Sequence, residues 1–162
     1  MGSLGSALFL LVATPVLAGA SDTSTMTSAT CPVTVAAEQP FREPSPSSAS
    51  QFWYGDEALA VLLRAGGWWR GMDTKHRYRT KLVWWRQGYD GRSGSWPSLT
   101  VTGKRLDASA PPADVSRATG AYHSDFGGWA MMVAVEFPTS GCWELTGEYQ
   151  GHALSFVVQV VP

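Results

Sequence analysis

The sequence of 162 residues contains no asparagine and no isoleucine, and its 3 lysines are outnumbered by 9 arginines. Without asparagine the chain has no acceptor for N-linked glycosylation. The codons for all three residues are AT-rich, so their scarcity indicates a GC-rich bacterial genome. Charge is also scarce, with 12 basic against 13 acidic residues. Because a nucleic-acid-binding surface needs a basic stripe, we expect no nucleic-acid partner.

Residues that build metal sites are few as well. Cys31 and Cys142 are the only cysteines, too few for a structural zinc site, and the 3 histidines show no ligand spacing. We therefore predict no metal and no other cofactor. Two cysteines in an exported protein usually form a disulfide, which we predict here, with two reduced thiols as the alternative. The parity of Cys142 places the bridge at the start of a strand, where it would pin the N-terminal segment, unlike the buried inter-sheet bridge of antibody domains.

The first 20 residues carry the pattern of an export signal. An apolar run beginning at residues 8–13 ends in Ala18-Gly19-Ala20, a small-residue site of the A-x-A type. We predict cleavage after Ala20, with an uncleaved membrane anchor as the alternative. The mature chain would then begin with a disordered stretch over residues 21–30 and continue as one domain over residues 31–162. This organisation predicts a secreted or cell-envelope protein without stable membrane insertion after cleavage.

Alternation of apolar and polar residues with a period of two predicts strands. The clearest examples cover residues 77–85 and 129–137, and shorter strands are expected over residues 58–63, 99–102, 143–146 and 154–160. Residues 31–35 suggest an edge strand. Loops are expected over residues 38–51 and 107–128, the second with room for a short helix, and a turn over residues 148–152. No stretch has a sustained helical period, so we predict an all-β fold, an immunoglobulin-like antiparallel β-sandwich with long loops.

The alternation also predicts which side chains form the core. Trp129 shares the parity of its apolar neighbours and is expected to be buried. The main predicted core consists of Leu82, Trp84, Val133, Val135, Trp143, Leu145, Phe156 and Val158.

Several short motifs resemble an uncharacterised family of exported bacterial proteins. The most specific is FPTSGCWELTG at residues 137–147, an FPTxGCWExTG-like stretch followed by LSFVV at residues 154–158. Weaker matches are CPVT (31–34), WWR (84–86), GKRLD (103–107) and APP (110–112). The closing hairpin is also similar to the last two strands of many immunoglobulin-like domains. The resemblance implies a fold and an extracytoplasmic location, and it carries over no catalytic residues.

No motif for a catalytic nucleophile is present, because the Gly-x-Ser-x-Gly register fails at Ser95. Five acidic positions could in principle supply a glycosidase pair, although exposed strand carboxylates are the favoured interpretation. They are Asp56, Glu57, Glu136, Glu144 and Glu148. We therefore predict no catalytic residues.

Tryptophan is the unusual residue, with 8 in the chain. In the adjacent pairs a strand would send the two rings to opposite faces, so one ring of each pair could lie on a binding surface or under a loop. The candidate binding residues are Trp53, Tyr54, Trp68, Trp69, Arg70, Trp85 and Arg86. Such a surface suits a carbohydrate or a protein ligand. The predicted function is an exported, non-catalytic binding or interaction domain. A small extracytoplasmic carboxylate-dependent hydrolase and a purely structural accessory domain are the alternatives.

Overall fold

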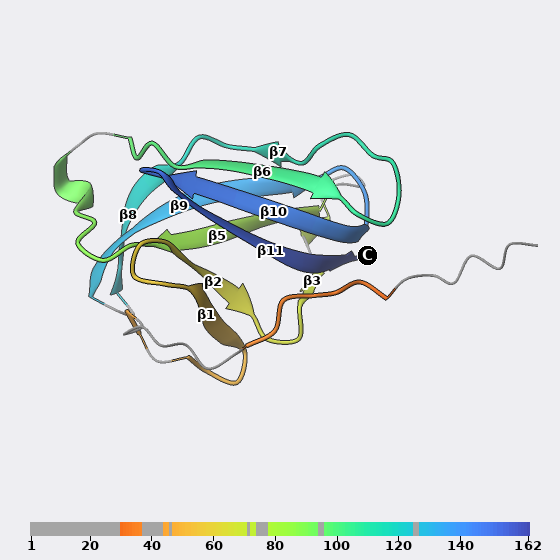
Figure 1. Ribbon diagram of the computed structural model, residues 1–162, viewed down its shortest axis with the longest axis horizontal. Helices are drawn as coiled ribbons and strands as arrows, with labels where there is room; N and C mark the ends of the chain where they lie inside the picture. Colours follow the sequence, from red (N-terminus) through yellow and green to blue (C-terminus); the bar gives the residue numbers. More distant parts are fainter. Residues whose placement is uncertain are drawn as a thin grey trace, which may run out of the picture.

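The computed structural model describes residues 30–36, 44–45, 47–70, 72–73, 78–93, 96–124 and 127–162. They form an immunoglobulin-like β-sandwich of two sheets, joined by long loops (Figure 1). The larger sheet contains β1 (Gln51–Gly55), β2 (Ala60–Arg64), β4 (Met72–Asp73), β5 (Tyr78–Trp85), β7 (Asp114–Val115), β8 (Thr119–His123) and β9 (Gly128–Phe137). The smaller contains β3 (Trp68–Arg70), β6 (Thr100–Arg105), β10 (Gly141–Tyr149) and β11 (His152–Val161).

The pairing of the described strands is antiparallel, with β3 on β11 as the parallel exception. β5 and β9 form the middle of the larger sheet, and β10 and β11 form the middle of the smaller one. The predicted export signal (residues 1–20) and residues 21–29 of the predicted disordered N-terminus lie outside the described residues. Among the described residues, no helix has the length and hydrophobicity needed to cross a membrane.

The core between the sheets confirms the alternation in the sequence. Every member of the main predicted core is buried in one cluster: Leu82, Trp84, Val133, Val135, Trp143, Leu145, Phe156 and Val158. Trp129 differs from the prediction, because it lies half-buried near one end of β9. There its ring is covered by Gly91, where an added Cβ would come within 2.3 Å of the indole.

Aromatic rings join the two sheets. Trp84 of β5 packs on Phe156 of β11 at a centroid distance of 5.8 Å, and Phe137 of β9 packs on Trp143 of β10 at 5.3 Å. The Trp84 ring also lies against Gly147, where an added Cβ would be 2.2 Å from the indole. This close approach explains a glycine in the middle of a long strand, because any side chain there would push the sheets apart.

The structure corrects several sequence-based boundaries. The aromatic stretches at residues 51–55 and 68–70 are strands β1 and β3, and the expected loop at 107–128 contains β7 and β8. Residues 31–35 are irregular, although Thr34 N donates to Val157 O at 2.9 Å. The sequence did not predict β1, β3, β7 and β8 because they are two to five residues long, too short for a clear alternation of apolar and polar residues.

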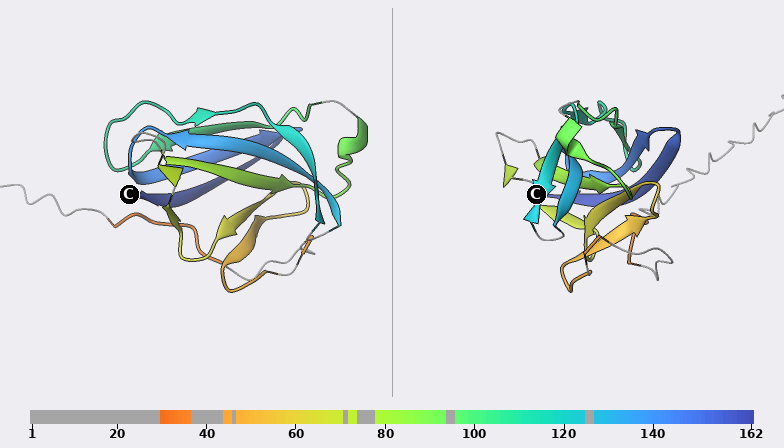
Figure 2. Two further views of the ribbon diagram at one scale, coloured as in Figure 1. Left: turned by 180° about the vertical axis from the view of Figure 1, so that it is seen from behind. Right: turned by 90° about the vertical axis from the view of Figure 1, so that its left-hand side faces the viewer.

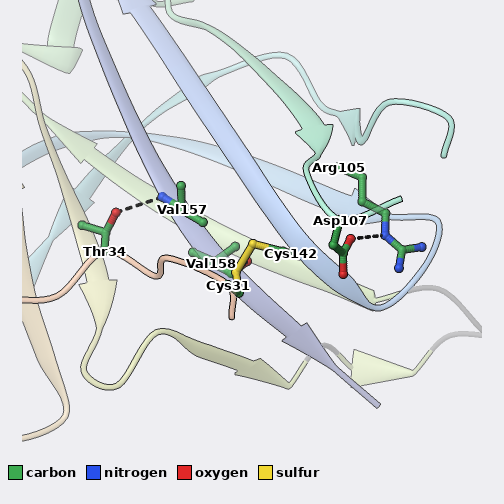
Figure 3. The surroundings of a disulfide bond; sticks show 7 residues. All are labelled: Cys31, Thr34, Arg105, Asp107, Cys142, Val157 and Val158. Atoms are coloured by element: carbon green, nitrogen blue, oxygen red, sulfur yellow. Dashed lines mark hydrogen bonds and ion pairs between the residues drawn. A yellow bond between two sulfur atoms is a disulfide. The ribbon is translucent and has the colours of Figure 1, made fainter. Parts of the chain in front are cut away.

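The predicted disulfide between Cys31 and Cys142 is present (Figure 3). Cys142 is the second residue of β10 and is buried, but it lies outside the cluster between the sheets. The bridge therefore pins the N-terminal segment beside β11, as its parity predicted. Thr34 reinforces this attachment, because its Oγ1 accepts a hydrogen bond from Val157 N at 2.9 Å.

Candidate functional site

The predicted binding residues do not share one surface. Trp53 is fully buried, and its indole Nε1 donates to Ser45 Oγ at 3.2 Å. Trp85 is half-buried and meets Trp53 edge-on, with ring centroids 6.4 Å apart. Both belong to a small apolar cluster on the outer face of the larger sheet, separate from the main core. Tyr54 has the opposite parity and packs against that main core. Trp53 and Trp85 thus form a satellite core beneath the segment that carries Ser45.

The two adjacent tryptophans of β3 point to opposite faces of the strand, as expected, so that one is exposed and the other is buried. Trp69 is buried against Phe137 and Phe156, and Trp68 is 64% exposed. Arg70 is exposed. Trp68 therefore presents an isolated ring on an edge strand, with no aromatic partner described beside it.

A pocket of about 560 Å³ opens at one end of the sandwich. Its lining residues belong to the end of the sandwich that carries the β10–β11 turn and the short 3₁₀ helix η1 (Gly91–Ser93). This end lies away from the C-terminus (Figures 1 and 2). Three segments line it: residues 86–90 after β5, residues 96–98 before β6, and Tyr149 with Gln150 at the end of β10. Arg86, one of the predicted binding residues, therefore lines this pocket.

One wall of the pocket holds the Arg86 guanidinium in place. Its Cζ lies 5.8 Å from the centre of the Tyr149 ring, a cation–π arrangement. Its Nη1 donates to Gln150 Oε1, and Gln150 Nε2 donates in turn to the Tyr149 hydroxyl at 3.2 Å. A guanidinium fixed in this way loses little side-chain entropy when a ligand binds to it.

Gln150 reaches this position through an unusual backbone conformation. Its φ is +49°, and Gly151 follows with φ +82°, so the predicted turn at residues 148–152 is confirmed as a two-residue connection. Two positive φ values define the type I′ turn, which normally has Asn or Gly at its first position. Glutamine pays a conformational penalty of about 1–2 kcal/mol there. That strain places its amide between Arg86 and Tyr149.

Tyr89 lines the pocket and contacts Tyr149 edge-to-face, with ring centroids 6.4 Å apart. Its hydroxyl is buried and has no hydrogen-bond partner among the described residues. Burial, with smaller contributions from Tyr149 and Asp90, raises the pKa of Tyr89 above its usual value. Because its pKa is raised, the Tyr89 phenol remains neutral over the physiological pH range. Asp90 itself holds the adjoining loop, since its Oδ1 accepts a hydrogen bond from Arg92 N at 3.0 Å.

Trp96 supplies the exposed aromatic surface of the pocket. The residue is 54% exposed while lining the pocket, and the Arg117 guanidinium lies 4.7 Å from its ring centre. The stacked arginine restrains the ring, so the indole is a pre-positioned flat surface rather than a loose side chain.

A second, smaller pocket of about 390 Å³ adjoins the first. The two share Ser98, Tyr149 and Gln150, and the second adds Glu148 and His152. Together they form a recess along the β10–β11 turn.

The acidic residues considered for a hydrolase are dispersed. Asp56 Oδ1 accepts hydrogen bonds from Ala58 N and Leu59 N within a turn. Glu144 forms an ion pair with Lys104 at 2.8 Å. Glu148 lies beside the second pocket. In the described part of the chain, no three His, Cys, Asp or Glu side chains group as a metal site would require.

The sequence did not single out the pocket because Tyr149 and Gln150 are more than 50 residues away from the other lining segments, residues 86–90 and 96–98. They meet only after β5, β6 and β10 are placed in their sheets. The one local signal was the turn at residues 148–152, where a Gln-Gly pair replaces the usual Asn-Gly.

No family model, curated protein or solved structure matches this chain. The resemblance of its closing hairpin to exported bacterial proteins therefore stays a prediction. Its site is defined by geometry alone.

Proposed function

We propose that this chain is an exported, non-catalytic binding domain that holds a small polar ligand in the end pocket. The observation that carries the proposal is the combination of an exposed, restrained indole at Trp96 with a fixed guanidinium at Arg86. The volume is within the range typical of small-molecule sites. The strained residue Gln150 lines the pocket, and strained residues cluster at functional sites.

Export is supported by the signal-like first 20 residues and by the disulfide, which persists in oxidising compartments. The protein recovered from the culture medium or periplasm should begin at Ser21, as determined by its intact mass. A mature protein that retains Met1 would contradict the predicted cleavage.

The ligand-binding proposal is tested by amide NMR of the exported protein, labelled with ¹⁵N. The probes are separate mixtures of monosaccharides and oligosaccharides, nucleotides, amino acids, dipeptides and small carboxylic acids at millimolar concentration. At least one mixture should shift amides of residues 86–90, 96–98 and 149–150 while those of β3 stay in place. If every mixture leaves these amides unchanged, the pocket is not a small-ligand site, and the structural accessory domain becomes the better interpretation.

A carboxylate-dependent hydrolase is the second candidate, favoured by one arrangement outside the end pocket. Asp114 of β7 lies directly opposite Glu136 of β9, and both line a shallow pocket of about 230 Å³ with Arg79. Directly opposed residues on antiparallel strands have Cβ atoms about 4.5–5.5 Å apart. Hydrolysis of a polysaccharide that is lost in Glu136→Gln and retained in Glu144→Gln would favour this function over the first.

A further inference from the structure

We infer that the ligand of the end pocket is a neutral carbohydrate of at least two sugar units, one ring of which stacks on Trp96. This inference rests on the proposed function and specifies its ligand. It follows from the aromatic surface, the hydrogen-bonding groups, the charge and the shape of the recess.

The aromatic surface is of the kind that a pyranose ring needs. One face of a pyranose presents mainly C–H groups, which pack on the flat electron-rich face of an indole. Trp96 is 54% exposed at the pocket, and Arg117 stacks on the same indole. Trp68 is as exposed but lies on an edge strand outside the pocket, so exposure alone does not distinguish Trp96.

The polar groups around Trp96 match hydroxyl groups rather than a ligand of one hydrogen-bonding type. Arg86 can only donate, and the Asp90 carboxylate can only accept. Gln87, Ser98 and Gln150 can do both. A sugar hydroxyl donates and accepts at the same atom, so a lining that mixes all three types can be satisfied by neighbouring hydroxyls of one ring.

Charge favours a neutral ligand. The pocket lining carries Arg86 and Asp90, Arg117 lies against Trp96, and the adjoining pocket adds Glu148, so the two positive and two negative formal charges cancel. A site for phosphate or carboxylate would need a surplus of cationic groups to offset the loss of ligand solvation. A neutral saccharide carries no such cost.

The shape of the recess favours a chain of sugars over a single ring. The pockets of about 560 and 390 Å³ adjoin at Ser98, Tyr149 and Gln150. A sugar on Trp96 therefore has a neighbouring site, beside Glu148 and His152, for the next unit of the chain.

The experiment titrates the exported protein with neutral oligosaccharides, separately the cello-, xylo-, malto- and chito-hexaoses, and with an acidic oligogalacturonide. Calorimetry measures affinity, and NMR follows the Trp96 indole and the pocket amides. We expect one neutral series to bind, with hexaose binding more tightly than its monosaccharide and with little dependence on salt. Trp96→Ala should weaken the affinity at least tenfold, and Trp96→Tyr should restore part of it.

Trp68→Ala is the matched control, since it removes an exposed indole outside the pocket and should leave affinity unchanged. Circular dichroism verifies that each variant folds. Gln87→Ala is a second variant of the pocket lining, for comparison with Trp96→Ala. If another compound class shifts the pocket amides and the saccharides do not, the carbohydrate inference is wrong and the binding proposal stands. If only the oligogalacturonide binds, with steep salt dependence, the assignment to neutral sugars is wrong. If no compound shifts the pocket, both proposals fail.

Discussion

The tryptophans in the middle of the sandwich and the tryptophan at its pocket end have contrasting surroundings. Trp84 and Trp143 are 0% exposed and interlock with rings from the opposite sheet. Trp96 is 54% exposed, at a pocket that is also lined by the strained Gln150. The middle is built for close packing, although the buried indole Nε1 atoms of Trp69 and Trp84 also have no described hydrogen-bond partner. The end differs because it combines an exposed ring with a strained backbone position. Such departures from local consistency are expected where a protein has a function besides folding.

The largest effect should come from the middle. Phe156→Ala would leave a cavity between Trp84 and Trp69, whose rings lie 5.8 and 6.3 Å from that of Phe156. We expect a loss of about 3–5 kcal/mol in the free energy of unfolding, measured by urea denaturation. Ligand affinity of the fraction that stays folded should be unchanged. An unaltered urea midpoint would show that Phe156 does not occupy the core.

The middle could be predicted from the sequence because its information is local. In β9 every second residue from Trp129 to Phe137 is apolar, and in β5 the alternating series ends in the buried Leu82 and Trp84, so the buried face is visible without knowing the partner strands. No local pattern of this kind in the sequence marks the end pocket. Arg86 was predicted for its aromatic neighbours, whereas its partners Tyr149 and Gln150 are more than 60 residues away, at the tip of another hairpin. The surroundings of Trp53 and Trp85 are likewise not local, since Trp53 donates to Ser45 and the two rings meet from different strands.

Removing the disulfide should lower stability without changing the pocket. Cys142 and Tyr149 occupy opposite ends of β10, which places them about 24 Å apart along an extended strand. The bridge closes a loop with a sequence separation of 111 residues, and its loss in a Cys31→Ser, Cys142→Ser variant should cost about 2–4 kcal/mol. Urea denaturation and ligand calorimetry measure the two effects separately. A large fall in affinity in the folded variant would contradict the independence of the two ends.

Variants of Gln150 test whether the backbone strain at this residue is retained because its side chain supports ligand binding. Gln150→Gly removes the conformational penalty of the positive φ but also the hydrogen bonds to Arg86 and Tyr149. Because these effects oppose each other, unfolding free energy should change by less than about 1 kcal/mol. Ligand affinity should fall three- to tenfold as the guanidinium loses its support. Gln150→Ala is the control, since it keeps the strain while losing the hydrogen bonds and should reduce both stability and affinity. Tighter binding by Gln150→Gly would rule out a supporting role for the side chain.

The smallest effect should come from Tyr89→Phe, which removes a buried hydroxyl that has no described partner. Relieving an unpaired polar group should raise stability by up to about 1 kcal/mol at pH 8. The pH dependence has a defined sign. The pKa of Tyr89 is raised in the folded protein, so above pH 10 the unfolded chain loses this proton first, and wild-type stability falls as pH rises further. The variant lacks this term, so its advantage should grow between pH 8 and pH 10.5 in paired urea titrations. A variant that is less stable at both pH values would mean that the hydroxyl forms a hydrogen bond in the folded protein, and that no unpaired group was relieved by its removal.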